Sequence, residues 1–330
     1  MTNLRLSVAI GDYDRTRPLV DGTVPVEGVD PTYMRLSPEE IFFRSFRNGE
    51  FDICEMSASS YVVSLAKGTA NYVAIPVFPS RAFRHTSFYV RKDHGIHSPA
   101  DLRGRRIGVP EYQLTACVWA RALLEDEYGV APGEITWVRG GLEEPGRVEK
   151  IELNLPGNVQ VEAAPADRSL SQMLEAGEID AIISPRVPSC FAAGNRNIGW
   201  IFEDPIAEAL AYFEKTGIFP IMHLVGIRRS VVEANPWLPT SVMKAFVKAK
   251  AHCLAHLSDT SATKVTLPFI EEQLQRARTA MGEDFWSYGY EANIHVLDAF
   301  LDAHYRQGLS PRRVEHAELF HPATLSTFRV

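Results

Sequence analysis

The chain has 330 residues, 45% of them hydrophobic, and a formal net charge of -7 at pH 7. Because one hydrophobic core rarely serves more than roughly 250 to 300 residues, this length predicts two lobes. The negative charge argues against a nucleic-acid partner, and no apolar run approaches the roughly 18 residues of a membrane span. The N-terminus has no secretion-signal pattern, which predicts a cytoplasmic protein.

Cysteine and histidine spacing gives no metal or redox motif. The four cysteines lie far apart, at Cys54, Cys117, Cys190 and Cys253. None belongs to a C-x-x-C pair, so we interpret them as buried thiols. His252 and His256 share a helix face, but the glutamate of a metalloprotease motif is missing there. We therefore expect neither a bound metal nor a cofactor.

The first part of the chain alternates predicted strands and helices. Alternating apolar residues predict a strand over 4–10, which ends at a polar loop over 11–17. Ser37-Pro38-Glu39-Glu40 supplies an N-cap, a proline and a capping-box acid, so a helix should run to about Asn48. The elements expected next are a strand over 51–56, a helix over 59–67 and a strand over 72–78.

The most informative stretch is residues 76–91, PVFPSRAFRHTSFYVR. It places Arg81, Arg84 and His85 between two apolar, strand-like runs, where small uncharged turn residues are usual. Guanidinium groups suit carboxylates, and an imidazole can hold or release a proton near neutral pH. A solvated basic loop is the simpler interpretation, but the aromatic and proline neighbours favour an anion site with a proton donor.

The alternation of predicted strands and helices starts again after residue 91. We expect a strand over 106–109, a helix over 115–128 and a strand over 135–138. Residues 140–168 are rich in Gly, Pro and Glu, and they should form an excursion or a hairpin, with one strand-like run near 159–162.

An internal echo links the two halves. Residues 47–53, RNGEFDI, are similar in sequence to residues 175–181, EAGEIDA. In each case a predicted helix ends at glycine and is followed by a strand that ends at a serine, Ser57 or Ser184. We interpret the echo as a sign of two related α/β lobes.

The last third of the chain is predicted to be helical. A second junction, residues 217–223, carries proline, aromatic residues and His223. Helices are expected after it over 238–257, 269–281 and 291–306, and their apolar spacing suggests a cover on one lobe.

Two α/β lobes joined by two crossings, with polar residues at both junctions, resemble a type II periplasmic-binding-protein fold with a helical C-terminal cover. The resemblance implies one lobe over 1–86 plus 220–330 and another over 87–219, with a ligand in the cleft between them. Open α/β sheets bind ligands at the carboxyl ends of their strands.

Four runs resemble the 4,5-dihydroxyphthalate decarboxylase family: GDYDRTRPLVDGTV, PVFPSRAFRHTSFYVR, GVPEYQLTACVW and EYGV. They occur in the same order over about the first 150 residues. The family converts 4,5-dihydroxyphthalate into 3,4-dihydroxybenzoate and carbon dioxide, a step in the catabolism of aromatic compounds. The resemblance therefore implies a carboxy-lyase that works without a cofactor, and a small aromatic carboxylate as its binding partner.

This chemistry needs a proton donor, a group that polarises the catechol and an anchor for the retained carboxylate. His85 is the preferred donor over His223, because it adjoins the proposed anchors Arg81 and Arg84. Glu111 or Asp12 would polarise the hydroxyls. Further substrate contacts are expected from residues at strand ends: Arg15, Arg17, Tyr112, Thr115 and Arg186. Thr115 would also cap the helix that it begins and direct free amides at an anion.

Each assignment has a structural alternative. His223 can equally be a satisfied core histidine, Glu111 can simply pair with an arginine, and Arg15 and Arg17 can form an ion network with Asp14. At the level of the whole protein, a binding or sensory protein for an aromatic dicarboxylate ranks second, since fold does not imply chemistry. A metal-assisted decarboxylase ranks third, and association into a homo-oligomer stays open.

Overall fold

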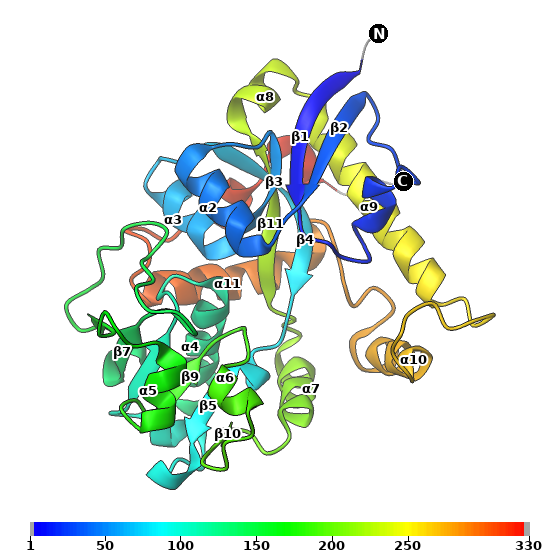
Figure 1. Ribbon diagram of the computed structural model, residues 1–330. Helices are drawn as coiled ribbons and strands as arrows, with labels where there is room; N and C mark the ends of the chain where they lie inside the picture. The colour runs from blue at the N-terminus through cyan, green and yellow to red at the C-terminus, as the bar shows by residue number, and fades with distance from the viewer. Residues whose placement is uncertain (1–2, 327–330) are drawn as a thin grey trace. The chain divides into compact units, whose positions relative to one another are not determined.

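The computed structural model describes residues 3–326, which fold into two compact units. Unit 1 comprises the residues up to Arg81, Ile221–Asp298 and the residues from Val314 onward. Unit 2 comprises Ala82–Pro220 and Ala299–Arg313. Each unit has its own sheet, so both are mixed α/β structures (Figure 1).

Unit 1 is built on a five-stranded sheet in the order β2-β1-β3-β11-β4. Its strands are β1 (Leu4–Ile10), β2 (Val29–Arg35), β3 (Ile53–Ser57), β4 (Tyr72–Arg81) and β11 (Ile221–Arg228). β1 is parallel to β2 and β3, whereas β11 is antiparallel to both β3 and β4. The late strand β11 is therefore inserted between two strands from the beginning of the chain.

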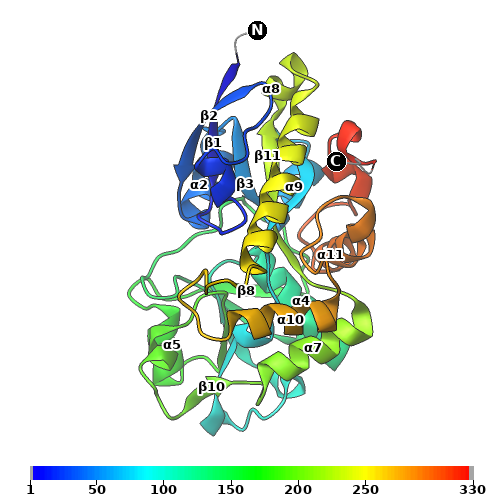
Figure 2. The same cartoon turned by 90° about the vertical axis from the view of Figure 1, so that its right-hand side faces the viewer.

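The helices of unit 1 are α1 (Arg17–Val20), α2 (Pro38–Asn48), α3 (Ala58–Ala66), α8 (Arg229–Ala234), α9 (Leu238–Leu257), α10 (Ile270–Met281) and α11 (Ile294–Arg306), which begins in unit 1 and ends in unit 2. α2 and α3 lie on one side of the strands and α9 on the other (Figures 1 and 2). α2 begins as predicted, because the Ser37 side chain accepts a hydrogen bond from the Glu40 amide at 3.4 Å, and it ends at Gly49 with φ of 58°.

Unit 2 contains a six-stranded sheet in the order β10-β5-β9-β6-β7-β8. The strands are β5 (Phe88–Arg91), β6 (Arg106–Val109), β7 (Thr136–Arg139), β8 (Gln160–Ala163), β9 (Ala181–Ile183) and β10 (Ile198–Trp200). Its helices are α4 (Thr115–Tyr128), α5 (Leu170–Ala176), α6 (Ser189–Ala192) and α7 (Pro205–Thr216). Leu170, Leu174 and Ile182 are fully buried where α5 packs on the sheet.

The internal echo has a structural counterpart. In unit 1, α2 ends at Gly49 and leads into β3, and in unit 2, α5 ends at Gly177 and leads into β9. Both glycines have positive φ angles, 58° and 75°, which a side chain would disfavour. The same turn therefore delivers a buried strand to each sheet.

The chain passes from unit 1 to unit 2 after Arg81 and returns at Ile221, and these two residues are paired in the β4–β11 ladder. The expected division needs three corrections. Residues 82–86, residue 220 and residues 299–313 all belong to unit 2. The last of these stretches makes the chain cross four times rather than twice.

The second half of α11 joins unit 2 because its side chains pack on α4. The rings of Phe300 and Trp119 lie 5.3 Å apart, and the Gln307 amide donates to the Val118 carbonyl at 3.0 Å. A cover over one lobe alone was therefore the wrong expectation for this helix. Periodicity reveals which face of a helix is apolar, but not which partner it meets.

Candidate functional site

The most distinctive polar contact of unit 1 joins Glu55 on β3 to His223 on β11. Their Oε1 and Nδ1 atoms are 2.5 Å apart, and the Glu55 carboxylate is completely buried. His223 lies where β11 shifts register against β4, between its pairings at Ile221 and Val225. Such bulges re-aim side chains and recur beside active sites. The ring of Phe42 meets His223 edge-on at 4.8 Å and fixes its plane.

Glu55 is held ionised by its neighbours. Burial raises the pKa of this carboxyl, but the His223 ring and hydrogen bonds from Tyr13 and Gly11 outweigh burial, so the pKa lies below its usual value. The Tyr13 hydroxyl donates to Oε1 at 2.8 Å, and the Gly11 amide donates to Oε2 at 2.9 Å. A buried carboxylate beside an imidazole orients the ring and stabilises its protonated form.

The loop after β1 depends on a glycine. A Cβ atom on Gly11 would lie 2.4 Å from Cζ of Tyr13, so only glycine lets the Tyr13 ring fold back to reach Glu55. Burial and the neighbouring Glu55 raise the pKa of Tyr13 far above its ordinary value, which keeps its hydroxyl protonated as a donor.

Arg15 is held rigidly in the same loop. Its guanidinium lies 4.4 Å from the centroid of the Tyr13 ring and 4.3 Å from that of Trp286. Its Nε donates to the Pro79 carbonyl at 2.7 Å, and its Nη1 pairs with Asp14 at 3.1 Å. This cation is thus positioned beside the residues that hold Glu55.

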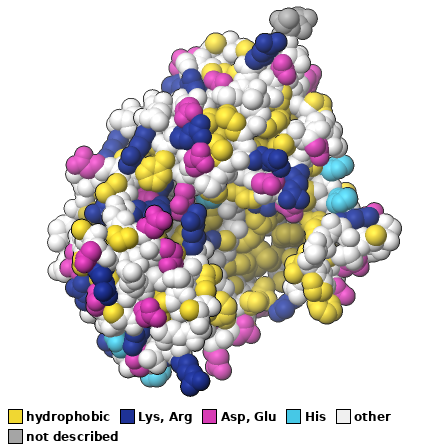
Figure 3. Space-filling model, viewed as in Figure 1, with side chains coloured by type: hydrophobic (Ala, Val, Ile, Leu, Met, Phe, Trp, Pro, Cys, Tyr) yellow, Lys and Arg dark blue, Asp and Glu magenta, His cyan; other side chains and the backbone are white. Residues whose placement is uncertain are grey.

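Two other candidates of this loop face solvent. Asp12 pairs with Arg17 at 3.2 Å and with Arg35 at 3.7 Å, and all three side chains are about half exposed. Figure 3 shows how acidic and basic side chains are interspersed on the viewed surface. Arg15 does pair with Asp14, as the ion-network alternative held, but Arg17 pairs with Asp12 instead.

Arg81, at the end of β4, holds a loop of its own unit. Its Nη2 donates to the Ser287 carbonyl at 2.8 Å and also to the Asn293 side chain. Burial lowers the pKa of Arg81 to about 9, although Tyr288 and Asp284 oppose that shift. These contacts give Arg81 a role in shaping the loop 287–293.

In unit 2, His85 occupies an aromatic box. The rings of Phe202, Tyr212 and Phe83 lie 5.2, 5.6 and 6.4 Å from it, and its Nδ1 has no hydrogen-bond partner within residues 3–326. Burial lowers its pKa to about 4, with Glu127 acting weakly in the other direction. A neutral imidazole at pH 7 is a poor proton donor, so these surroundings disfavour the acid role expected of His85.

Arg84 differs from the other buried cations. Its side chain is almost buried, its Nε donates to the Ala82 carbonyl at 3.3 Å, and it pairs with no carboxylate in the described part of the chain. Burial lowers its pKa to about 10, while Cys117 and Tyr89 oppose the shift. A desolvated guanidinium without an acid is suited to accept an anion.

Glu111 is the centre of a buried ion cluster. Its Oε1 lies 2.6 Å from Arg147 Nη2 and 2.5 Å from Lys150 Nζ, and the Lys150 amide donates to Oε2 at 3.2 Å. Burial lowers the pKa of Lys150, which Glu111 opposes. The carboxylate is thereby engaged in holding the 147–150 segment, as the structural alternative proposed.

The remaining candidates of unit 2 are dispersed. Tyr112 is a core residue whose ring lies 3.8 Å beneath the Arg121 guanidinium and 5.9 Å from Trp137. Thr115 is the first residue of α4, and Leu114 occupies the N-cap position, so the expected capping by Thr115 was wrong. Arg186 has an exposed side chain, and its amide donates to Ser184 Oγ at 3.1 Å.

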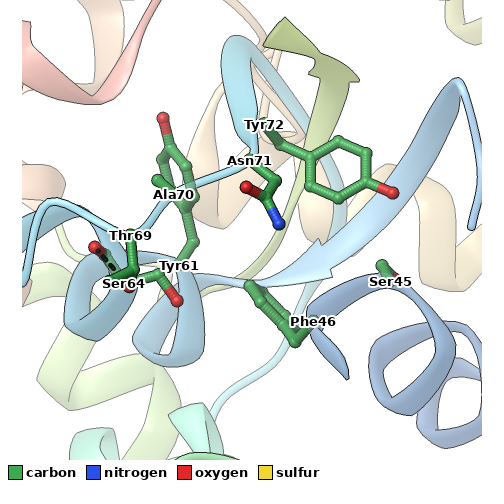
Figure 4. Close-up of a pocket in the computed structure, with 8 residues that line it drawn as sticks. All are labelled: Ser45, Phe46, Tyr61, Ser64, Thr69, Ala70, Asn71 and Tyr72. Carbon is green, nitrogen blue, oxygen red and sulfur yellow. Dashed lines mark hydrogen bonds between the residues drawn. The ribbon is translucent and has the colours of Figure 1, made fainter. Parts of the chain in front are cut away.

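A small cavity of about 20 Å³ lies between α2, α3 and the start of β4 (Figure 4). Its lining includes Ser45, Tyr61, Asn71 and Tyr72. Such a volume holds about one water molecule, so an aromatic acid does not fit there.

Within residues 3–326, no group of three or more His, Cys, Asp or Glu side chains is placed to hold a metal ion. In the same residues, no helix is long and apolar enough to cross a membrane.

Comparison with solved structures defines the class of fold. The periplasmic aliphatic sulphonate binding protein SsuA from Escherichia coli superposes with a TM-score of 0.54 at 14% identity, covering 100% of this chain and 96% of that one. Residues 31–144 also match the family described as ABC transporter, phosphonate, periplasmic substrate-binding protein. The chain thus has a periplasmic-binding-protein fold, as the sequence predicted.

Curated relatives identify the family. The chain is 58% identical over 330 residues, the full length of both chains, to 4,5-dihydroxyphthalate decarboxylase of Comamonas testosteroni. It is 57% identical over 213 residues to the enzyme of that name from Pseudomonas putida, which covers 64% of this chain and 83% of that protein. The chain belongs to the 4,5-dihydroxyphthalate decarboxylase family.

Sequence reasoning missed Glu55, Tyr13 and Trp286. Glu55 offered a signal, because a glutamate within the apolar run Ile53–Ser57 has to find a partner if the strand is buried. Tyr13 and Trp286 offered none, since the contact of Tyr13 with Glu55 and that of Trp286 with Arg15 link parts of the chain that are distant in sequence.

Replacing Glu111 by glutamine should destabilise the protein, because Lys150 and Arg147 would stay buried without a carboxylate. We expect the free energy of unfolding to fall by about 3 to 5 kcal/mol, measured by urea denaturation. Glu162→Gln is the matched control: its pair with Arg106 is about half exposed and contributes at most about 1 kcal/mol. Unchanged stability with lost turnover in Glu111→Gln would instead assign Glu111 to the reaction.

Proposed function

We propose that this chain catalyses the decarboxylation of 4,5-dihydroxyphthalate to 3,4-dihydroxybenzoate and carbon dioxide, and is therefore a carboxy-lyase. The observation that carries this proposal is the 58% identity to the Comamonas testosteroni decarboxylase over the full length of both chains. The Glu55–His223 pair supplies what a binding protein would not need, a buried acid–base group.

The reaction has a simple electronic requirement. Each carboxylate of the substrate is para to a hydroxyl, so partial deprotonation of that phenol pushes electron density onto the carbon that carries the carboxylate. This carbon takes up a proton, the bond to the carboxylate breaks, and the bonding electrons restore the aromatic ring as carbon dioxide leaves. One proton is consumed, and the second carboxylate is retained.

We assign the proton transfer to His223. Glu55 engages Nδ1, which leaves Nε2 as the nitrogen that delivers the proton to the ring carbon. Glu55 orients the imidazole for the transfer, and Tyr13 and Gly11 keep Glu55 in place. Arg15, held in contact with two aromatic rings, is the proposed cation for the developing phenolate charge.

Arg84 is the proposed ligand of the carboxylate that is retained. Its guanidinium is desolvated and has no acidic partner in the part of the chain that the structure describes, so an anionic ligand would relieve the cost of burying it.

A binding or sensory protein for an aromatic dicarboxylate is the second candidate. It is favoured by the match of residues 31–144 to a periplasmic substrate-binding family.

The cytoplasmic location stays a prediction, which fractionation of cells expressing the chain would test.

The proposed reaction can be measured directly. Purified, chelator-treated protein should convert 4,5-dihydroxyphthalate into equimolar 3,4-dihydroxybenzoate and carbon dioxide, followed by chromatography and gas release. Tight binding without either product would support the binding protein instead. Turnover that vanishes with the chelator and returns with a divalent metal would support the metal-assisted alternative.

Two histidine variants test the proton donor. His223→Asn should keep the dissociation constant within a few-fold while single-turnover rates fall by roughly 10²- to 10⁴-fold, as expected for loss of a general acid. His85→Asn should keep most of the turnover, because a neutral His85 in its aromatic box delivers no proton at pH 7. The opposite ranking of the two variants would return the donor role to His85.

Arg84→Ala tests the carboxylate ligand. Substrate and product both carry the retained carboxylate, so binding of both should weaken by about 10- to 100-fold, the range of one or two charged hydrogen bonds. Arg103→Ala, which removes an exposed pair with Glu134, is the control and should bind both normally. Normal product affinity in Arg84→Ala would exclude this role.

A further inference from the structure

Tyr288 carries a buried hydroxyl that the fold itself does not use. Its side chain is 8% exposed, and its oxygen has no hydrogen-bond partner within residues 3–326. An unsatisfied buried hydroxyl is costly and rare in folded proteins, so its presence requires an explanation.

The segment around Tyr288 is rigid, so the hydroxyl cannot simply turn to another partner. The Trp286 indole donates to the Phe78 carbonyl at 2.9 Å, and the Gly289 amide donates to the Pro76 carbonyl at 2.8 Å. Arg81 holds the Ser287 carbonyl between them. These contacts fasten the segment along β4.

The ring of Tyr288 is fixed as well. The Lys250 ammonium lies 5.0 Å from its centroid and bonds to the Trp286 carbonyl at 3.0 Å. Loop anchoring and ring packing together define one direction for the hydroxyl.

Tyr288 belongs to the same polar region as the Glu55–His223 pair. Arg15 stacks on Trp286 and on Tyr13, and Tyr13 donates to Glu55. Burial raises the pKa of Tyr288 well above its ordinary value; Arg15 and Arg81 lower it, while Glu55 raises it further. The phenol is therefore a neutral donor within electrostatic reach of two guanidinium groups, Arg15 and Arg81, and two carboxylates, Glu55 and Asp14.

We propose that the Tyr288 hydroxyl donates a hydrogen bond to a catechol oxygen of the substrate and makes the site selective for hydroxylated aromatic acids. This inference rests on the proposed function and deepens it by naming the residue that reads the hydroxyl groups. Tyr288 is then a specificity-determining residue in addition to the proton-transfer pair.

The charges of the region favour a catechol oxygen over a carboxylate as the acceptor. A substrate carboxylate beside Glu55 would meet a buried like charge, whereas a hydroxyl carries none in the ground state. As negative charge develops on that oxygen during the reaction, the Tyr288 donor and Arg15 stabilise it. Sites built to bond a substrate hydroxyl reject analogues that lack it.

Tyr288→Phe tests this inference, with binding measured by calorimetry. The first ligand is 3,4-dihydroxybenzoate, which keeps both hydroxyls and is not consumed, and the second is benzoate, which lacks them. We expect affinity for 3,4-dihydroxybenzoate to fall by about 10- to 100-fold, with benzoate affinity unchanged. Affinity for 3,4-dihydroxybenzoate within twofold of wild type, or equal losses for both ligands, would overturn the proposal.

Thermal unfolding separates this role from a structural one. Because the hydroxyl is unsatisfied in the fold, Tyr288→Phe should melt at or above the wild-type temperature. Tyr61→Phe is the matched control: its hydroxyl donates to the Leu319 carbonyl at 2.7 Å and accepts from the Ala74 amide at 3.2 Å, so its loss should lower the melting temperature and leave ligand affinities unchanged. A lower melting temperature for Tyr288→Phe would mark the hydroxyl as structural.

The binding measurement does not depend on turnover. If wild-type protein bound 3,4-dihydroxybenzoate through Tyr288 but released no carbon dioxide from 4,5-dihydroxyphthalate, the proposed reaction would fail while this inference held. If wild-type protein released carbon dioxide from 4,5-dihydroxyphthalate but Tyr288→Phe bound 3,4-dihydroxybenzoate normally, the proposed reaction would hold and this inference would fail.

Discussion

The organisation of unit 1 depends on one contact, the buried pair of Glu55 and His223. An ionised carboxylate with no exposure to water is costly unless several donors surround it. Here the donors come from Tyr13, Gly11 and the imidazole, which lies 168 residues further along the chain. The antiparallel insertion of β11 beside β3 is what brings that imidazole to the carboxylate.

Other features of unit 1 follow from this requirement. Gly11 must lack a side chain so that Tyr13 can reach Glu55, and the register shift of β11 against β4 occurs at His223 itself. The Arg15 guanidinium then contacts the ring of Tyr13 and also that of Trp286. The proposed proton-transfer pair and the packing that positions it are therefore parts of one network of contacts.

The sequence was sufficient for features that are local. The capping residues of α2, the bounds of α9 at Leu238 and Leu257, and the glycine turns before β3 and β9 each depend on a few adjacent residues. The site was less accessible because its contacts are long-range. His85 drew attention because it adjoins Arg84, yet only the tertiary structure reveals its aromatic box, and the role of Glu55 depends on a strand from the far end of the chain.

Pairing of buried charges separates structural from functional groups more sharply than residue type does. Glu111 satisfies Lys150 and Arg147, and its buried charge is thereby explained within the fold. Arg84 and the hydroxyl of Tyr288 are different. Within residues 3–326, Arg84 has no acidic partner and the Tyr288 hydroxyl has no hydrogen-bond partner. A fold that leaves such groups unsatisfied forgoes stability, and a ligand that satisfies them restores it. For Arg84 such a ligand would have to be an anion, and for the Tyr288 hydroxyl it would have to be a hydrogen-bond acceptor.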